Sequence, residues 1–131
     1  WLLESPDGLE VAGSGICANL HDYARLGLFA LNGGVIDGES VVPEGWFTEA
    51  TEPRMAGSDP LNYGYMWWPV PDRDGDFKEG AFSARGIFGQ YIYVNPSRGI
   101  VLTVLSCRSK PKFSEAILDN DFFNAAVDAL S

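Results

Sequence analysis

Histidine and cysteine are scarce in this sequence, and their scarcity restricts its chemistry. Histidine occurs once among 131 residues, as His21, so a Ser-His-Asp triad requires it and a metal site built on several histidines is disfavoured. We expect His21 in the first turn of a helix, beside Asp22, where a surface role is the more common one. Cys17 and Cys107 each lie in an apolar run, which favours two buried thiols over a single disulfide bridge.

Positive charge and long apolar runs are scarce as well. Nine basic residues stand against 18 acidic ones, and the formal net charge of −9 argues against nucleic acid or an anionic membrane as a partner. No apolar run approaches the length that spans a bilayer, and the first residues lack the features of a signal peptide. The apolar start at residues 1–3 predicts that a further segment precedes the chain. Its hydrophobic content of 46% is sufficient for the core of one domain.

Common catalytic motifs are missing. The sequence has no G-x-S-x-G nucleophile elbow and no Gly-rich phosphate loop followed by lysine. Ser109 and Lys112 have the S-x-x-K spacing, but they follow a predicted strand, whereas that motif needs a helix to place both side chains on one face. Tyr93 and Asn95 have a Tyr-x-Asn spacing that ends a hairpin strand before Pro96, so we interpret it as part of a turn. Both matches are taken as coincidental.

The first half of the chain is predicted to be mainly helical. Asn19 resembles a helix cap, and a helix is expected from about Leu20 to Asn32, ended by left-handed glycines at 33 and 34. Its apolar face contains Gly27, which is expected to permit close packing; the other members of this face are Leu20, Tyr23, Ala24, Ala30 and Leu31. The elements expected next are a hairpin over 35–42 with Asp37-Gly38 at its turn, a short helix from Pro43 to about Ala50, and a loop from Thr51 to Leu61.

The second half is predicted to form an antiparallel sheet with a closing helix. The expected strands are Asn62 to Val70, Phe77 to Phe82, Tyr91 to Val94 and Ile100 to Cys107, with turns at 72–76 and 95–99 and a final helix from Phe113 to Leu130. The fold class is therefore α+β, with about three main strands, small hairpins and flanking helices. We expect one unit over 1–131, with a mainly helical part over 1–61 and the sheet and closing helix over 62–131.

The glycine-containing stretch from Ser83 to Gln90 joins two of these strands. Glycine at 86 and 89 allows a ligand to approach the backbone closely, so the N–H of Ile87 is a candidate donor to developing negative charge. An ordinary chain-reversing turn is the alternative interpretation, and the stretch alone does not distinguish the two.

Several blocks in order carry a resemblance to a known family. They are residues 13–27 (GSGICANLHDYARLG), Gly33 to Val35, Gly38, Val41 to Pro43, Trp46, Tyr63 to Trp68 and Phe82 to Gly99. Together they resemble the serine β-lactamase-like hydrolases, the group that includes class C β-lactamases, related esterases and 6-aminohexanoate-dimer hydrolases. No block is decisive alone, but their order over essentially the whole chain is specific.

The resemblance implies an acyl-enzyme hydrolase with a β-lactamase/transpeptidase-like fold. In that family a serine of an S-x-x-K motif attacks the carbonyl, its lysine and a tyrosine of a second motif move protons, and a K-T-G-like motif lies on a sheet edge. The first two motifs precede the region that this chain resembles, so the chain matches a C-terminal portion of the domain. Residues 84–86 (Ala-Arg-Gly) match the third motif.

Site residues follow from that match. Ile87 is expected to donate the second oxyanion N–H, with Gly86 beside it, and Ala84, Arg85, Gly89 and Gln90 are expected near the substrate. Ala84 stands where many relatives carry Lys or His, which favours an esterase or amidase over recognition of a β-lactam carboxylate. Arg85 either restores positive charge near the site or is a solvated turn residue.

The resemblance also implies partners. A small ester or amide is the expected substrate of the intact protein, no cofactor is implied, and a bacterial cytoplasm or periplasm is the implied compartment. Without the S-x-x-K nucleophile the chain is expected to be inert alone. The strand Ile100 to Ser106 pairs with an N-terminal strand in the family, so we expect its edge to bind a missing N-terminal half or a second copy.

Two other hypotheses remain at this point. A non-catalytic module would bind a glycan or peptide through the aromatic side chains Tyr63, Tyr65, Trp67 and Trp68. Because alternate residues of a strand face opposite ways, one tryptophan is expected in the core and the other near a cleft rim. A fragment left by proteolysis or by a partial gene is compatible with the hydrolase hypothesis.

Overall fold

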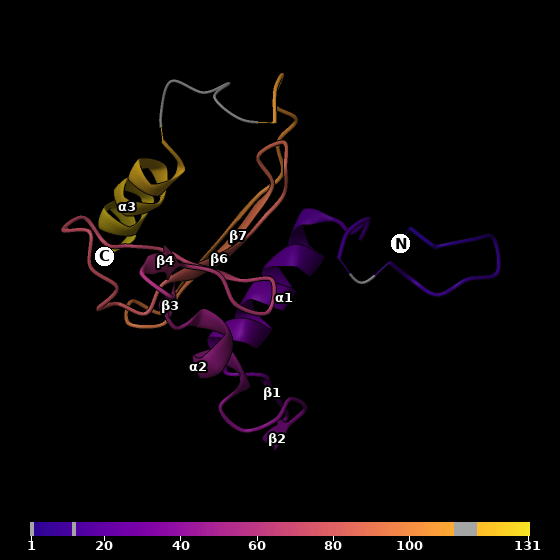
Figure 1. Cartoon of the computed structure of the whole chain (residues 1–131), viewed down its shortest axis with the longest axis horizontal. Helices are drawn as coiled ribbons and strands as arrows, with labels where there is room; N and C mark the ends of the chain where they lie inside the picture. The colour runs from indigo at the N-terminus through magenta and orange to yellow at the C-terminus, as the bar shows by residue number, and fades with distance from the viewer. Residues whose placement is uncertain (1, 12, 112–117) are drawn as a thin grey trace.

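The computed structural model describes residues 2–11, 13–111 and 118–131 and has an α+β fold. A four-stranded antiparallel sheet, in the order β5-β6-β7-β8, lies between helices α1 and α3, and residues 2–11 extend away from this body (Figure 1). The predicted fold class is confirmed, although the main sheet has four strands instead of about three. Within the described residues, no helix is long and apolar enough to cross a membrane.

Helix α1 (Leu20–Leu31) confirms the predicted start and end signals. The Asn19 side chain accepts a hydrogen bond from the Asp22 N–H at 3.0 Å, which satisfies one of the free amides of the first turn. Gly33 and Gly34 follow the helix with φ of 66° and 81°, a conformation that glycine adopts at no steric cost. His21 is exposed in the first turn, as predicted.

Gly27 brings α1 close to the sheet. A Cβ at this position would lie 2.5 Å from Val101 Cγ1 and 3.0 Å from Ile92 Cγ2, so the helix packs where only glycine fits. The buried Ala30 continues the same contact one turn later. The prediction that Gly27 permits close packing is therefore confirmed.

We expect Gly27→Val to lower the free energy of unfolding by about 2–3 kcal/mol, because the added methyl groups force α1 away from the short, stiff side chains below it. Leu28→Val, on the exposed side of the same helix, should change it by less than about 0.5 kcal/mol. Urea unfolding followed by circular dichroism measures both. Equal effects of the two substitutions would contradict the close packing.

The elements after α1 partly match the prediction. Strands β1 (Val35–Ile36) and β2 (Glu39–Ser40) form the expected hairpin, with Asp37 and Gly38 at φ of 50° and 84°. Helix α2 (Trp46–Thr51) begins later than Pro43, because Gly45 takes a left-handed conformation immediately before it.

Two segments differ from the prediction. The predicted loop from Thr51 to Leu61 contains strands β3 (Arg54–Ala56) and β4 (Asp59–Leu61), which pair around Gly57 at a φ of 67°. The predicted strand from Asn62 to Val70 is reduced to β5 (Trp68–Pro69). In front of β5, Gly64 and Trp67 exchange backbone hydrogen bonds of 2.8 and 2.9 Å, so the chain reverses where extended structure was expected. The two residues between them have positive φ.

The main sheet continues with β6 (Phe82–Arg85), β7 (Tyr91–Asn95) and β8 (Ile100–Val104). The strand predicted over 77–82 begins later in the chain, at Phe82. Gly80 has a φ of 63°, which is not an extended conformation, so the strand cannot begin before it. The acidic turn at 72–76 and the turn after Asn95 are present as predicted.

Side chains alternate between two cores, one on each face of the sheet. Helix α3 (Asp119–Leu130) covers one face, and its side chains complete a core formed by Val70, Ala81, Tyr91, Tyr93, Phe123 and Val127. Helix α1 covers the other face, where the core consists of Ala30, Phe82, Ile92 and Val94. The start of the predicted closing helix, residues 113–117, lies outside the described residues.

The prediction of buried thiols is wrong, because Cys17 and Cys107 are both exposed, and both are free.

Candidate active-site loop

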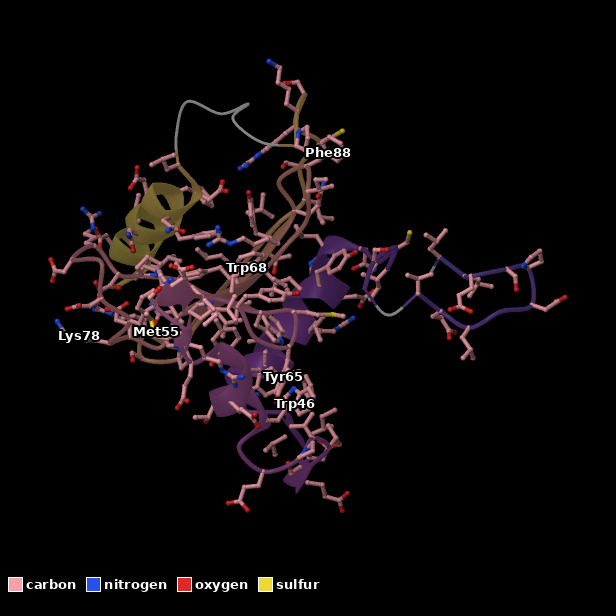
Figure 2. All side chains as sticks on the ribbon, viewed as in Figure 1. Trp46, Met55, Tyr65, Trp68, Lys78 and Phe88 are labelled. Atoms are coloured by element: carbon pink, nitrogen blue, oxygen red, sulfur yellow. The ribbon has the colours of Figure 1, made fainter. Side chains whose placement is uncertain are left out.

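Residues 86–90 form the loop between β6 and β7, at one end of the sheet, where Figure 2 labels Phe88. The loop is closed by hydrogen bonds from the Gly86 N–H to the Gln90 carbonyl at 2.7 Å and from the Gly89 N–H to the Gly86 carbonyl at 3.2 Å. Ile87 lies between them and is 66% exposed. Its N–H donates to no described residue, whereas the N–H groups of Gly86, Phe88 and Gly89 all have acceptors. The Ile87 N–H is thus a free amide on an exposed residue of the loop.

The two glycines of this loop face its interior. A Cβ at Gly86 would lie 2.4 Å from Gln90 Oε1 and 2.9 Å from Gln90 Cβ. A Cβ at Gly89, where φ is 84°, would lie 2.5 Å from Ser106 Oγ and 2.3 Å from Arg108 Nε. The two glycines thus leave space for the side chains of Gln90, Ser106 and Arg108. The sequence did not indicate these contacts.

Arg85 and Ala84 lie on opposite faces of the sheet. Arg85 Nε donates to Ser83 Oγ at 2.9 Å, and its guanidinium also donates to Asn120 Oδ1 at 3.1 Å and lies 5.9 Å from the centre of the Phe123 ring. Partial desolvation lowers the pKa of the Arg85 guanidinium, although the residue as a whole is exposed, and an arginine remains charged at neutral pH. Ala84 packs with the core on the α1 side. The Arg85 cation is thus bound to α3 and the sheet.

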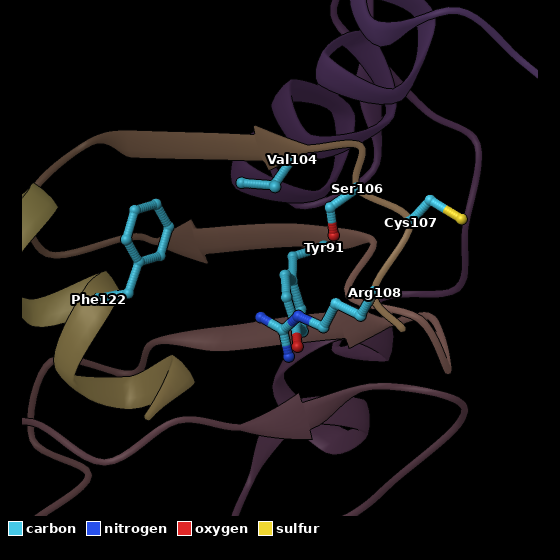
Figure 3. Close-up of a pocket in the computed structure, with 6 residues that line it drawn as sticks. All are labelled: Tyr91, Val104, Ser106, Cys107, Arg108 and Phe122. Atoms are coloured by element: carbon cyan, nitrogen blue, oxygen red, sulfur yellow. The ribbon is translucent and has the colours of Figure 1, made fainter. Parts of the chain in front are cut away.

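Behind the loop, on the α3 side, lies an open pocket of about 350 Å³ (Figure 3). Its lining residues are Tyr91, Val104, Ser106, Cys107, Arg108 and Phe122. Asp119 accepts hydrogen bonds of 2.7 Å from both the Tyr91 hydroxyl and the Arg108 guanidinium, which also lies 5.2 Å from the Tyr91 ring.

These contacts determine the protonation of the cluster. Burial, and then the hydrogen bond to Asp119, raise the pKa of Tyr91 to about 12. Burial alone would raise the pKa of Asp119, but the hydrogen bonds from Arg108 and Tyr91 outweigh it and the pKa is lowered. Tyr91 is therefore protonated at neutral pH and is unsuited to act as a general base. Sequence reasoning missed this cluster, since its members are far apart in the chain and have no characteristic spacing.

The two coincidental motif matches have structural explanations. Tyr93 and Asn95 are buried in β7, where Asn95 Nδ2 donates to Glu79 Oε2 at 2.7 Å and to the Tyr93 hydroxyl at 3.1 Å. Asn95 Oδ1 accepts from the Arg98 N–H in the following turn, as a turn residue does. Ser109 is exposed and non-helical, and its partner Lys112 lies outside the described residues.

The aromatic side chains predicted for a binding module do not form one surface. Trp67 is half-buried against Phe82, with ring centres 5.1 Å apart, while Trp68 is 43% exposed beside Tyr63 at 4.5 Å. As predicted, one tryptophan packs against the core, and it is Trp67. Trp68 is exposed, and its expected place at a cleft rim stays a prediction. Tyr65 belongs to a separate pair with Trp46, stacked at 4.8 Å (Figure 2).

The comparisons with known proteins agree with this fold. A sequence model of the Beta-lactamase family matches residues 2–123, so the chain belongs to the β-lactamase family of hydrolases. It is similar to a 6-aminohexanoate-dimer hydrolase from Paenarthrobacter ureafaciens, with 28% identity over 114 residues. The match covers 79% of this chain but 28% of that relative, so the chain spans little more than a quarter of the relative's length. The resemblance inferred from the sequence blocks is confirmed.

Proposed function

We propose that this chain forms one wall of the active site of a serine esterase or amidase of the β-lactamase family. The observation that carries the proposal is the N–H of the exposed residue Ile87, which has no acceptor among the described residues and lies in a loop held by hydrogen bonds. Oxyanion holes require such a donor, unpaired in the resting protein and fixed in direction.

The proposed reaction proceeds through an acyl-enzyme. A serine hydroxyl attacks the carbonyl carbon of the substrate, and the carbonyl oxygen becomes an oxyanion that accepts hydrogen bonds from the Ile87 N–H and from the N–H of that serine. Collapse of the tetrahedral intermediate expels the alcohol or amine, and water then releases the acid. One oxyanion donor contributes about 10²- to 10³-fold to kcat.

The groups around the loop support a small ester or amide as substrate. Ala84 carries no charge, and the Arg85 guanidinium is bound to Ser83 and Asn120. The residues that match the third motif therefore supply no unengaged cation that could recognise a carboxylate on the substrate. The curated relative is named for hydrolysis of a 6-aminohexanoate dimer, and we extend to this chain only the general class of ester or amide.

The nucleophile is proposed to come from a polypeptide segment outside this sequence. The one S-x-x-K match begins at Ser109, which is not on a helix, and Tyr91 is not suited to act as a base. The test is complementation: hydrolysis of p-nitrophenyl acetate is measured with the chain alone and with a segment, encoded upstream, that carries a helical S-x-x-K.

Strand β8 is the proposed contact with that segment. It lies at one edge of the main sheet, and β7 is its one partner among the described strands. An unpaired edge invites another strand, so we expect the isolated chain to associate with itself at micromolar concentration. Leu105→Lys, placed just beyond the edge at a 47% exposed leucine, should reduce association. Leu130→Lys, at a 64% exposed leucine on α3, should leave it unchanged. Light scattering measures the mass, and a monodisperse monomer would count against this contact.

A further inference from the structure

The side chain of Gln90 is engaged at both ends within the loop. Its Oε1 accepts a hydrogen bond from the Phe88 N–H at 3.2 Å, and its Nε2 donates to the Ser106 carbonyl. It thereby connects the loop to the chain just after β8. A side-chain amide offers one acceptor and two donors, so most of this capacity is already used inside the protein.

The surrounding residues are shaped to fit this side chain. Gly86 has no Cβ where one would collide with Gln90, and the Gly86 N–H donates to the Gln90 carbonyl at 2.7 Å. From the other side, the Arg108 N–H donates to the Phe88 carbonyl at 3.0 Å. The Ser106 hydroxyl donates to the Gly89 carbonyl, and its Oγ also lies 3.2 Å from the Phe88 carbonyl oxygen. The peptide groups on both sides of Phe88 are therefore held by residues from outside the loop tip.

Ile87 is held indirectly by this arrangement. Its N–H makes no hydrogen bond to a described residue, but the Gly86 carbonyl of the same planar peptide unit accepts from the Gly89 N–H at 3.2 Å, and the peptide groups on either side restrain its direction further. The preceding residue is fixed by its bond to the Gln90 backbone, and the following N–H by the Gln90 side chain. One residue thus restrains the chain on both sides of the free amide.

We propose that Gln90 is a positioning residue that helps to fix the direction of the Ile87 N–H, together with the Gly89–Gly86 hydrogen bond, by connecting the Phe88 N–H to the Ser106 carbonyl. This inference rests on the proposed function, since a fixed direction matters because the amide is to meet an oxyanion. It replaces the expectation that Gln90 contacts the substrate.

The first test is amide NMR on the ¹⁵N-labelled 131-residue chain. Gln90→Met keeps the length of the side chain but removes its donor and acceptor. We expect the Phe88 amide to exchange about tenfold faster and the backbone order parameter of Ile87 to fall from about 0.85 towards 0.6. Gln90→Glu keeps an acceptor for the Phe88 N–H but loses the donor to the Ser106 carbonyl, so the order parameter of Ile87 should fall in this variant as well. As a control, Ser97→Ala removes another side-chain bond to a backbone carbonyl, at 2.8 Å, in the turn after β7, and should leave Ile87 unchanged.

The second test is kinetic and uses the complemented enzyme described above. Gln90→Met should lower kcat about tenfold with KM within about twofold, because an interaction made in the transition state is weakened. Unchanged Ile87 and Phe88 amides in folded Gln90→Met, or an unchanged kcat, would overturn the proposal. If Gln90→Met does not fold, an unchanged Ile87 order parameter in folded Gln90→Glu overturns it. A complemented protein without esterase activity would refute the proposed function. The restraint on Ile87 could still be measured, because the NMR experiment does not depend on hydrolysis.

Discussion

The purified 131-residue chain should hydrolyse p-nitrophenyl acetate no faster than buffer does. Removing the nucleophile from a serine hydrolase lowers kcat on the order of a million-fold, and here the S-x-x-K match begins at an exposed, non-helical serine. An oxyanion donor without a nucleophile has no tetrahedral intermediate to stabilise.

The absorbance of released p-nitrophenolate measures this directly. Ser109→Ala is the matched control, because it removes the one serine with S-x-x-K spacing and should leave the blank rate unchanged. Turnover that co-purifies with the chain and disappears in Ser109→Ala would show that this motif is catalytic and that our interpretation of it is wrong.

Removal of the Ile87 N–H should lower kcat of the complemented enzyme by about 10²- to 10³-fold, with KM changed far less. Replacing the peptide bond before Ile87 by an ester removes the hydrogen and keeps the side chain. Because this N–H has no acceptor among the described residues, the replacement should barely affect folding.

The same replacement before Gly99 is the control for that experiment. The Gly99 N–H donates to the Pro96 carbonyl at 3.3 Å, in the turn at the other end of β7, so its loss should cost some stability but no activity. Equal kcat for the Ile87 ester and the unmodified enzyme would exclude the Ile87 amide as an oxyanion donor.

Local signals in the sequence predicted local structure well. Asn19 capping α1, the paired glycines that end it and the Asp37-Gly38 hairpin turn each depend on the conformation of a few adjacent residues. The aromatic and β-branched residues of β7 likewise predicted a strand on a half-buried surface. The strand is present, but cores on both faces bury it completely.

The errors arose where contacts between distant residues determine the conformation. Tyr65 and Met66 adopt positive φ, rare for side chains of their size, so an aromatic run typical of a strand contains a reversal. The β3–β4 hairpin has a proline opposite Met55, and its composition resembles a loop. Apolar neighbours suggested burial of the cysteines, yet both lie at the surface.

The sequence indicated the candidate loop, whose role stays a prediction, but it did not indicate how the loop is held. Glycine spacing and family resemblance led to Ile87, whereas the roles of Gly86 and Gly89 depend on Gln90, Ser106 and Arg108. Those contacts form only when the chain after β8 folds back along the loop, so no sequence spacing could indicate them.

Complementation followed by mass spectrometry tests the central claim most directly. The chain is mixed with the segment that carries the helical S-x-x-K, p-nitrophenyl acetate is added, and both turnover and acetylated peptides are measured. We predict turnover only when both polypeptides are present, with the acetyl group on the serine of the added segment. Turnover by the chain alone, or an acetylated serine within residues 1–131 that forms and decays at the rate of turnover, would contradict the account.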